Sequence, residues 1–110
     1  MDKEISRMEN LLQLVCARHV HEQMKGAPFT YTTFEKVVRE IDYLDVLQEF
    51  IELSKRCDIS ENIRITCITN VCRAEYRTEM QSESWKKKLF KKTQSISRVE
   101  KWFTSKLMTV

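Results

Sequence analysis

Apolar residues recur every three or four positions along the first 55 residues, which is the spacing of one face of an α-helix. In the first segment, about residues 5–24, the repeating positions are Ile5, Met8, Leu11, Leu12, Val15, Cys16 and His19. Gly26 and Pro28 follow, and they end the helix because glycine suits the position after a helix and proline cannot continue one. The pattern therefore predicts one long amphipathic helix before the first break.

Two shorter helices are predicted between this break and residue 54. Thr30 or Thr32 can cap the first, with Glu35 completing a capping box for Thr32, and Asp42 can cap the second. The predicted buried positions are Phe34, Val37, Val38 and Ile41 in the first helix and Leu44, Leu47, Phe50, Ile51 and Ser54 in the second. The connection between the two helices is short, so they must turn sharply on one another. Such a turn is typical of a helix-turn-helix and equally of small helical bundles.

Residues 59–80 fit two secondary structures. Read at a period of two, one face of a first strand carries Ile63, Ile65 and Cys67. Asn70 would then turn the chain, and residues 71–78 would return as a second strand. Read at a period of 3.6, one helical face carries Ile63, Cys67, Val71 and Ala74. The density of isoleucine and threonine favours strands, so the sequence predicts a β-hairpin within residues 62–79, with a helix as the alternative.

A basic segment follows from residue 82. Trp85, Leu89 and Phe90 can face the core there while lysines surround them. A final helix is predicted to begin at Ser95 or Ser97, with apolar positions at Val99, Trp102, Phe103 and Leu107. Tryptophans are large apolar anchors, so this segment is expected to pack against the domain.

The length of 110 residues is enough for one compact domain, taken here as residues 1–110. We expect a fold that is mainly α with a small β-hairpin: a winged helix-turn-helix with additional C-terminal helices. The alternative is an all-α helical bundle. A single glycine excludes phosphate-binding loops built on repeated glycines.

Charge is unevenly distributed along the chain. Residues 1–81 carry 11 Lys or Arg against 14 Asp or Glu, whereas residues 82–110 carry eight against two, a net charge of +6. Such asymmetry is typical of a protein that binds a polyanion. The predicted contacts with the phosphates of duplex DNA are Arg64, Arg73, Arg77, Lys86, Lys87, Lys88, Lys91 and Lys92. The arginines would join the lysines if they lie on one hairpin, and binding would be weak, sensitive to salt and largely independent of base sequence.

The third predicted helix is acidic, with Asp42, Asp45, Glu49 and Glu52. Phosphate would repel it, because a helix that reads the major groove normally presents Arg, Lys, Asn or Gln. We therefore expect this helix to face away from DNA or toward neighbouring proteins.

No residue spacing typical of a catalytic or metal site is found. Cys16, Cys57, Cys67 and Cys72 form no C-x-x-C pair, and His19 and His21 point in different directions on a helix. Cys16 and His19 share a helix face, but a buried thiol beside a hydrogen-bonded histidine is the simpler interpretation. We expect no catalysis, metal, cofactor or small-molecule substrate.

No apolar run is long enough to span a membrane, and the polar N-terminus is unlike a secretory signal.

Four short stretches together resemble a known family. They are Ala17-Arg18-His19-Val20, Pro28-Phe29-Thr30-Tyr31, Glu75-Tyr76 and the closing Trp102-Phe103-Thr104-Ser105-Lys106-Leu107. In order and spacing they resemble the C-terminal winged-helix domain of origin recognition complex subunit four. The resemblance implies a fragment that lacks the family's upstream ATPase region. It also implies a nuclear module of DNA-replication initiation, which would contact duplex DNA and dock other subunits of the same complex. The alternative is an all-helical protein–protein interaction domain that binds no nucleic acid.

Overall fold

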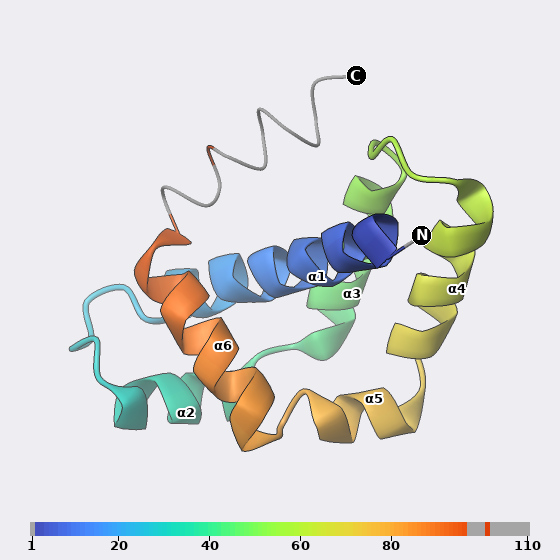
Figure 1. Ribbon diagram of the computed structural model, residues 1–110. Helices are drawn as coiled ribbons and strands as arrows, with labels where there is room; N and C mark the ends of the chain where they lie inside the picture. Colours follow the sequence, from blue (N-terminus) through green and yellow to red (C-terminus); the bar gives the residue numbers. More distant parts are fainter. Residues whose placement is uncertain (1, 97–100, 102–110) are drawn as a thin grey trace.

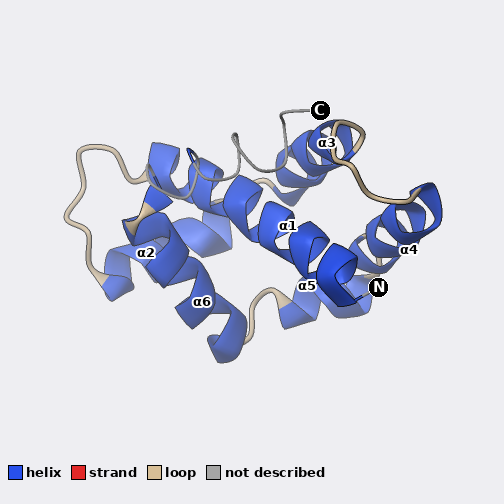
Figure 2. Ribbon diagram, turned by 45° about the horizontal axis from the view of Figure 1, so that its top comes forward, coloured by secondary structure: helices blue, strands red, loops and turns tan. Residues whose placement is uncertain are grey.

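The computed structural model describes residues 2–96 and residue 101, and this part of the chain is mainly helical (Figures 1 and 2). Its helices are α1 (Asp2–Gln23), α2 (Tyr31–Glu40), α3 (Tyr43–Ser54), α4 (Glu61–Val71), α5 (Ala74–Glu79) and α6 (Glu83–Gln94). No strand is present within the described residues. The predicted final helix, with Val99, Trp102, Phe103 and Leu107, lies outside them.

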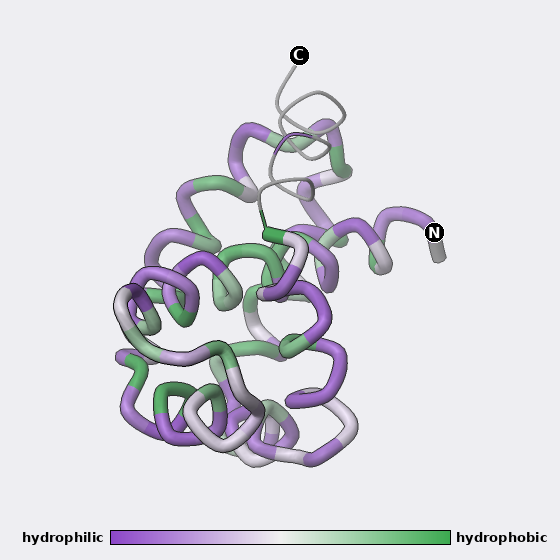
Figure 3. The backbone as a smooth tube through the Cα atoms, turned by 90° about the vertical axis from the view of Figure 1, so that its left-hand side faces the viewer, coloured by the Kyte–Doolittle hydropathy of each residue, from purple (hydrophilic) through white to green (hydrophobic). Residues whose placement is uncertain are grey.

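The long helix α1 is the centre of the fold. It packs mainly against α3 and α6, which lie on opposite sides of it in Figure 2. Its buried residues are Met8, Leu11, Leu12, Leu14, Val15, Cys16, Ala17 and Val20, and Met24 is buried directly after it. This set is wider than the single predicted stripe because neighbours cover α1 on more than one side. Along the described helices, hydrophobic and hydrophilic residues alternate in the way this packing requires (Figure 3).

The ends of the first three helices follow the sequence signals. Gly26 has a φ of 84°, a conformation that glycine adopts without strain. The Thr30 hydroxyl accepts a hydrogen bond of 3.2 Å from the Thr33 backbone N–H, so Thr30 caps α2. Asp42 caps α3 in the same way, with its carboxylate 2.9 Å from the backbone nitrogen of Leu44.

The β-hairpin predicted within residues 62–79 is wrong. These residues form α4 and α5, with a break at Cys72 and Arg73. Thr66, whose β-branched side chain favoured a strand, donates its hydroxyl to the backbone oxygen of Asn62 at 2.8 Å, inside the helix. The apolar side of α4 packs on α1 and α3, so tertiary contacts outweigh the β propensity of isoleucine and threonine. The described chain therefore fits the all-α alternative.

The buried face of α3 also differs from the prediction. Val46, Phe50 and Ser54 are buried, whereas Leu44 is 66% exposed. Apolar residues cover more than half of the circumference of α3, so periodicity alone does not specify which part faces the core. Packing against α1 selects the face of Val46 and Phe50, and Leu44 is left on the outside.

Candidate functional site

The basic segment predicted from residue 82 forms α6. Ser82 begins it, because the Ser82 hydroxyl accepts a hydrogen bond of 3.2 Å from the Trp85 backbone N–H. Trp85, Lys86, Leu89 and Thr93 are buried in the packing of α6. The helical periodicity therefore divides the five lysines of α6 between buried and exposed positions.

Lys86 is the buried lysine of α6. Its ammonium group lies 2.8 Å from the Glu35 carboxylate on α2 and 2.9 Å from the Glu83 carboxylate on α6. The hydrogen bonds to Glu35 and Glu83 raise the pKa of Lys86. Tyr31 on α2 donates its hydroxyl to Glu83 at 2.9 Å. These contacts tie α2 to α6, so Lys86 can reach a phosphate only if it leaves both carboxylates.

Lys87, Lys88 and Lys91 are exposed on α6, and we call these three residues the α6 lysine face. The one exposed carboxylate of α6 is Glu83, one helical turn before Lys87, and it is paired with Lys86 and accepts a hydrogen bond from Tyr31. Lys92 is only partly exposed, and its ammonium lies 3.2 Å from the side-chain oxygen of Asn10 on α1. Burial lowers the pKa of Lys92. Among the lysines of α6, the freely solvated charge is therefore concentrated on the α6 lysine face.

The three predicted arginine contacts lie on other helices. Arg64 is on α4, 3.9 Å from the Glu61 carboxylate. Arg73 is exposed and precedes α5. Arg77 is on α5, with its guanidinium carbon 5.9 Å from the centre of the Tyr43 ring. Because α4 and α5 replace the hairpin, the contact that was expected to unite these arginines on one wing is absent from the described residues.

The solvent side of α3 combines apolar and acidic residues. We call the following set the α3 outer face: Leu44, Asp45, Gln48, Ile51 and Glu52, of which Ile51 is half-buried and the others are exposed. Leu44 and Ile51 lie seven residues apart, or two helical turns, and form an apolar strip. Asp45 and Glu52 repeat the same spacing along one edge of that strip. The pair of acidic residues ends near Lys55, whose ammonium is 3.7 Å from the Glu52 carboxylate.

An aromatic group lies beside the α6 lysine face. Phe29, in the loop before α2, is 38% exposed and stacks on Phe90 of α6 with ring centres 5.1 Å apart. Tyr31 and Phe34 also pack on Phe90, at 5.3 and 5.1 Å. Lys87 lies three residues before Phe90 on α6, so the two are neighbours on the helix surface and an apolar edge adjoins the lysines.

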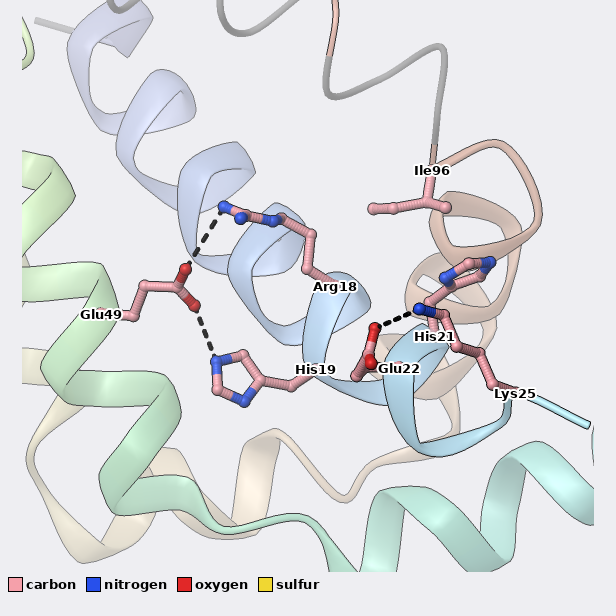
Figure 4. A pocket seen from close by; sticks show the side chains of 7 residues that line it. All are labelled: Arg18, His19, His21, Glu22, Lys25, Glu49 and Ile96. Atoms are coloured by element: carbon pink, nitrogen blue, oxygen red, sulfur yellow. Dashed lines mark hydrogen bonds and ion pairs between the residues drawn. The ribbon is translucent and has the colours of Figure 1, made fainter.

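A cavity of about 410 Å³ opens near the C-terminal end of α1 (Figure 4). It is lined by Arg18, His19, His21, Glu22, Lys25, Glu49 and Ile96. Glu49 on α3 lies 2.7 Å from His19 and 3.3 Å from Arg18, while Lys25 lies 2.9 Å from Glu22. The carboxylates in the cavity are thus paired with cationic groups of its own wall. The contact of Glu49 with α1 fixes α3 in place rather than leaving an open charged site.

The hypothetical pair of Cys16 and His19 does not form a reactive site in this arrangement. Cys16 is 1% exposed, and burial raises the pKa of its thiol to about 12, which disfavours the nucleophilic thiolate. His19 instead pairs with Glu49. Among the described residues, no three His, Cys, Asp or Glu side chains gather as metal ligands. None of the described helices is both long and apolar enough to cross a membrane.

Comparisons with protein families, characterised proteins and solved structures found no match for this chain.

Proposed function

We propose that the chain is an all-helical protein–protein interaction domain that binds a partner through the α3 outer face. The observation that carries this proposal is the position of Leu44, 66% exposed on a regular helix. A single exposed leucine is common on protein surfaces. Leu44, however, shares its face with Ile51 and is edged by the carboxylates of Asp45 and Glu52. An apolar strip edged by charge of one sign suits the docking of a basic, partly apolar surface.

The α3 outer face is held in position before any partner binds. Val46 and Phe50 anchor the opposite side of α3 in the core, and Glu49 pairs with Arg18 and His19 of α1. Asp42 caps the helix immediately before Leu44. A preorganised face loses little conformational freedom on binding, which supports an interaction role.

The test is capture of a partner by the full chain from an extract of the cells that make it. Leu44→Asp places a charge in the apolar strip, and it suits the first turn of α3 because acidic residues are favoured at a helix N-terminus. The matched control is Ile65→Asp on α4, since Ile65 is also an exposed apolar residue, at 49%. We expect the wild type and the control to retain a second protein that Leu44→Asp loses. Equal retention by Leu44→Asp, with circular dichroism confirming that all three chains are folded, would contradict the proposal.

A second candidate is binding of DNA phosphates, and the α6 lysine face is the observation that favours it. Lys87, Lys88 and Lys91 are exposed, and the one exposed carboxylate of α6, Glu83, is already paired with Lys86. Together with the resemblance to the C-terminal domain of origin recognition complex subunit four, this supports a nuclear role in replication initiation. In that case the acidic α3 would face other subunits of the complex.

This second candidate predicts a specific salt dependence. Replacing Lys87, Lys88 and Lys91 by alanine removes up to three phosphate contacts, so the slope of log affinity against log salt should fall by roughly three. A matched control replaces three other exposed cations, Lys36, Arg39 and Arg73, by alanine. If duplex DNA binds wild type and the α6 variant with the same affinity and slope, this candidate is wrong.

A further inference from the structure

We infer that the α3 outer face binds a second copy of this chain, which offers its α6 lysine face. The inference rests on the proposed function and names the partner. Its basis is that one chain carries both members of a complementary pair of surfaces.

The charges of the two faces are complementary. On α3, Asp45 and Glu52 stand two helical turns apart, about 10 Å along the axis. On α6, Lys87 and Lys91 stand one turn apart, with Lys88 beside them, and their long side chains can span the remaining distance. The one exposed carboxylate of α6, Glu83, lies one turn before Lys87 and is already paired with Lys86 and Tyr31.

The apolar parts of the two faces also match. The strip of Leu44 and Ile51 adjoins the acidic edge of α3. The stacked rings of Phe29 and Phe90 adjoin the lysines of α6, with Phe29 38% exposed. Each face therefore has apolar side chains next to a pair or group of like charges, Asp45 and Glu52 on α3 and the three lysines on α6. Contact between them would remove Leu44 and Phe29 from water while pairing the charges.

The fold directs this contact to another molecule. In Figure 2, α3 and α6 lie on opposite sides of α1, and both pack against it. Their outer faces point away from the shared helix, so the α6 lysine face cannot reach the α3 outer face of its own chain. A contact between two different faces is heterologous, and each copy added leaves one face of each kind free at the two ends. We therefore expect head-to-tail association that continues with concentration.

Charge reversal of each face in the full chain tests this inference. The first variant is Lys87→Glu/Lys88→Glu/Lys91→Glu, and the second is Asp45→Lys/Glu52→Lys. Sedimentation velocity should show that the wild type associates as its concentration rises, and less so at high salt because screening weakens the pairing. Each variant alone should stay monomeric, because its two faces then carry the same sign. An equimolar mixture should associate again, since every face of one variant meets the opposite charge on the other.

A control with the same charge change as the lysine variant is Lys36→Glu/Arg39→Glu/Arg73→Glu, on α2 and before α5. It should associate as the wild type does. A monomeric wild type at every concentration, a mixture that stays monomeric, or a control that is monomeric as well would overturn the inference. If self-association fails but Leu44→Asp still abolishes capture of another protein, only the identity of the partner is wrong. If Leu44→Asp also has no effect, the proposed function fails too.

Discussion

The lysines of α6 carry the same charge in the sequence, but the fold gives them different surroundings. Lys86 is buried between Glu35 and Glu83, whereas the neighbouring Lys87 is exposed. Glu35 lies 51 residues away in the chain, so no local pattern could predict this ion pair. The sequence predicts the basic segment, and only the packing of α2 on α6 shows which lysine is structural.

Replacing Lys86 by methionine should therefore lower the free energy of unfolding by about 1 kcal/mol, because Glu35 loses its charged hydrogen-bond partner in a partly buried position. Lys87→Met changes a solvated residue of the same type, and its effect should stay within about 0.5 kcal/mol. Urea denaturation of the two variants and the wild type measures both values. Equal stability of the two variants would show that the Lys86 pairs contribute nothing.

The ionisation of a single residue, Tyr76, should also make the stability of the fold depend on pH. Burial, followed by the nearby Glu9 carboxylate, raises the pKa of Tyr76 from 10.0 to about 12. The folded state thus keeps the phenol neutral. The stability that depends on this neutral phenol is fully present below pH 10 and is lost as the pH rises from 10 toward 12. Tyr76→Phe has no phenol to ionise, so it should lose less stability across that interval. Thermal unfolding between pH 9 and 12 measures this, and identical pH profiles for both chains would contradict it.

At the scale of elements, local sequence signals predict where a helix ends more reliably than they predict whether a segment forms a helix or a strand. The helix boundaries lie where they were predicted, at Gly26, Thr30 and Asp42. Each of these signals depends only on residues that are near in sequence. The pattern of residues 62–79 is ambiguous because isoleucine and threonine favour strands, while Ile63, Cys67 and Val71 also fit one side of a helix. The exposure of Leu44 could not be predicted from the sequence either, since both faces of α3 contain apolar residues.

A substitution at Thr69, which is exposed in the last turn of α4, distinguishes a helix from a strand by experiment. Thr69→Ala should raise the free energy of unfolding by about 0.5 kcal/mol, because alanine has the higher helix propensity. In a β-hairpin the same change should lower stability, since threonine is the better strand residue. Chemical denaturation gives the sign directly. A clear loss of stability, without loss of helical circular dichroism elsewhere, would contradict the assignment of α4.

For the molecule as a whole, the central fact is the separation of charge across α1. The α3 outer face is acidic and apolar, the α6 lysine face is basic, and α1 lies between the two helices. The charge asymmetry of the sequence predicts that two such regions exist. Their placement on opposite sides depends on how α3 and α6 pack on α1, which the linear pattern does not contain. This arrangement is the basis of the proposed binding between molecules.

Hydroxyl-radical footprinting of the full chain, alone and in complex with its captured partner, tests the interaction surface most directly. Oxidation of a side chain falls when a partner covers it, so the measurement reports on individual residues of the α3 outer face. We predict that Leu44 and Ile51 lose reactivity in the complex, while the exposed Ile65 on α4 keeps it. Unchanged reactivity of Leu44 and Ile51 in a complex that protects other residues would contradict the account.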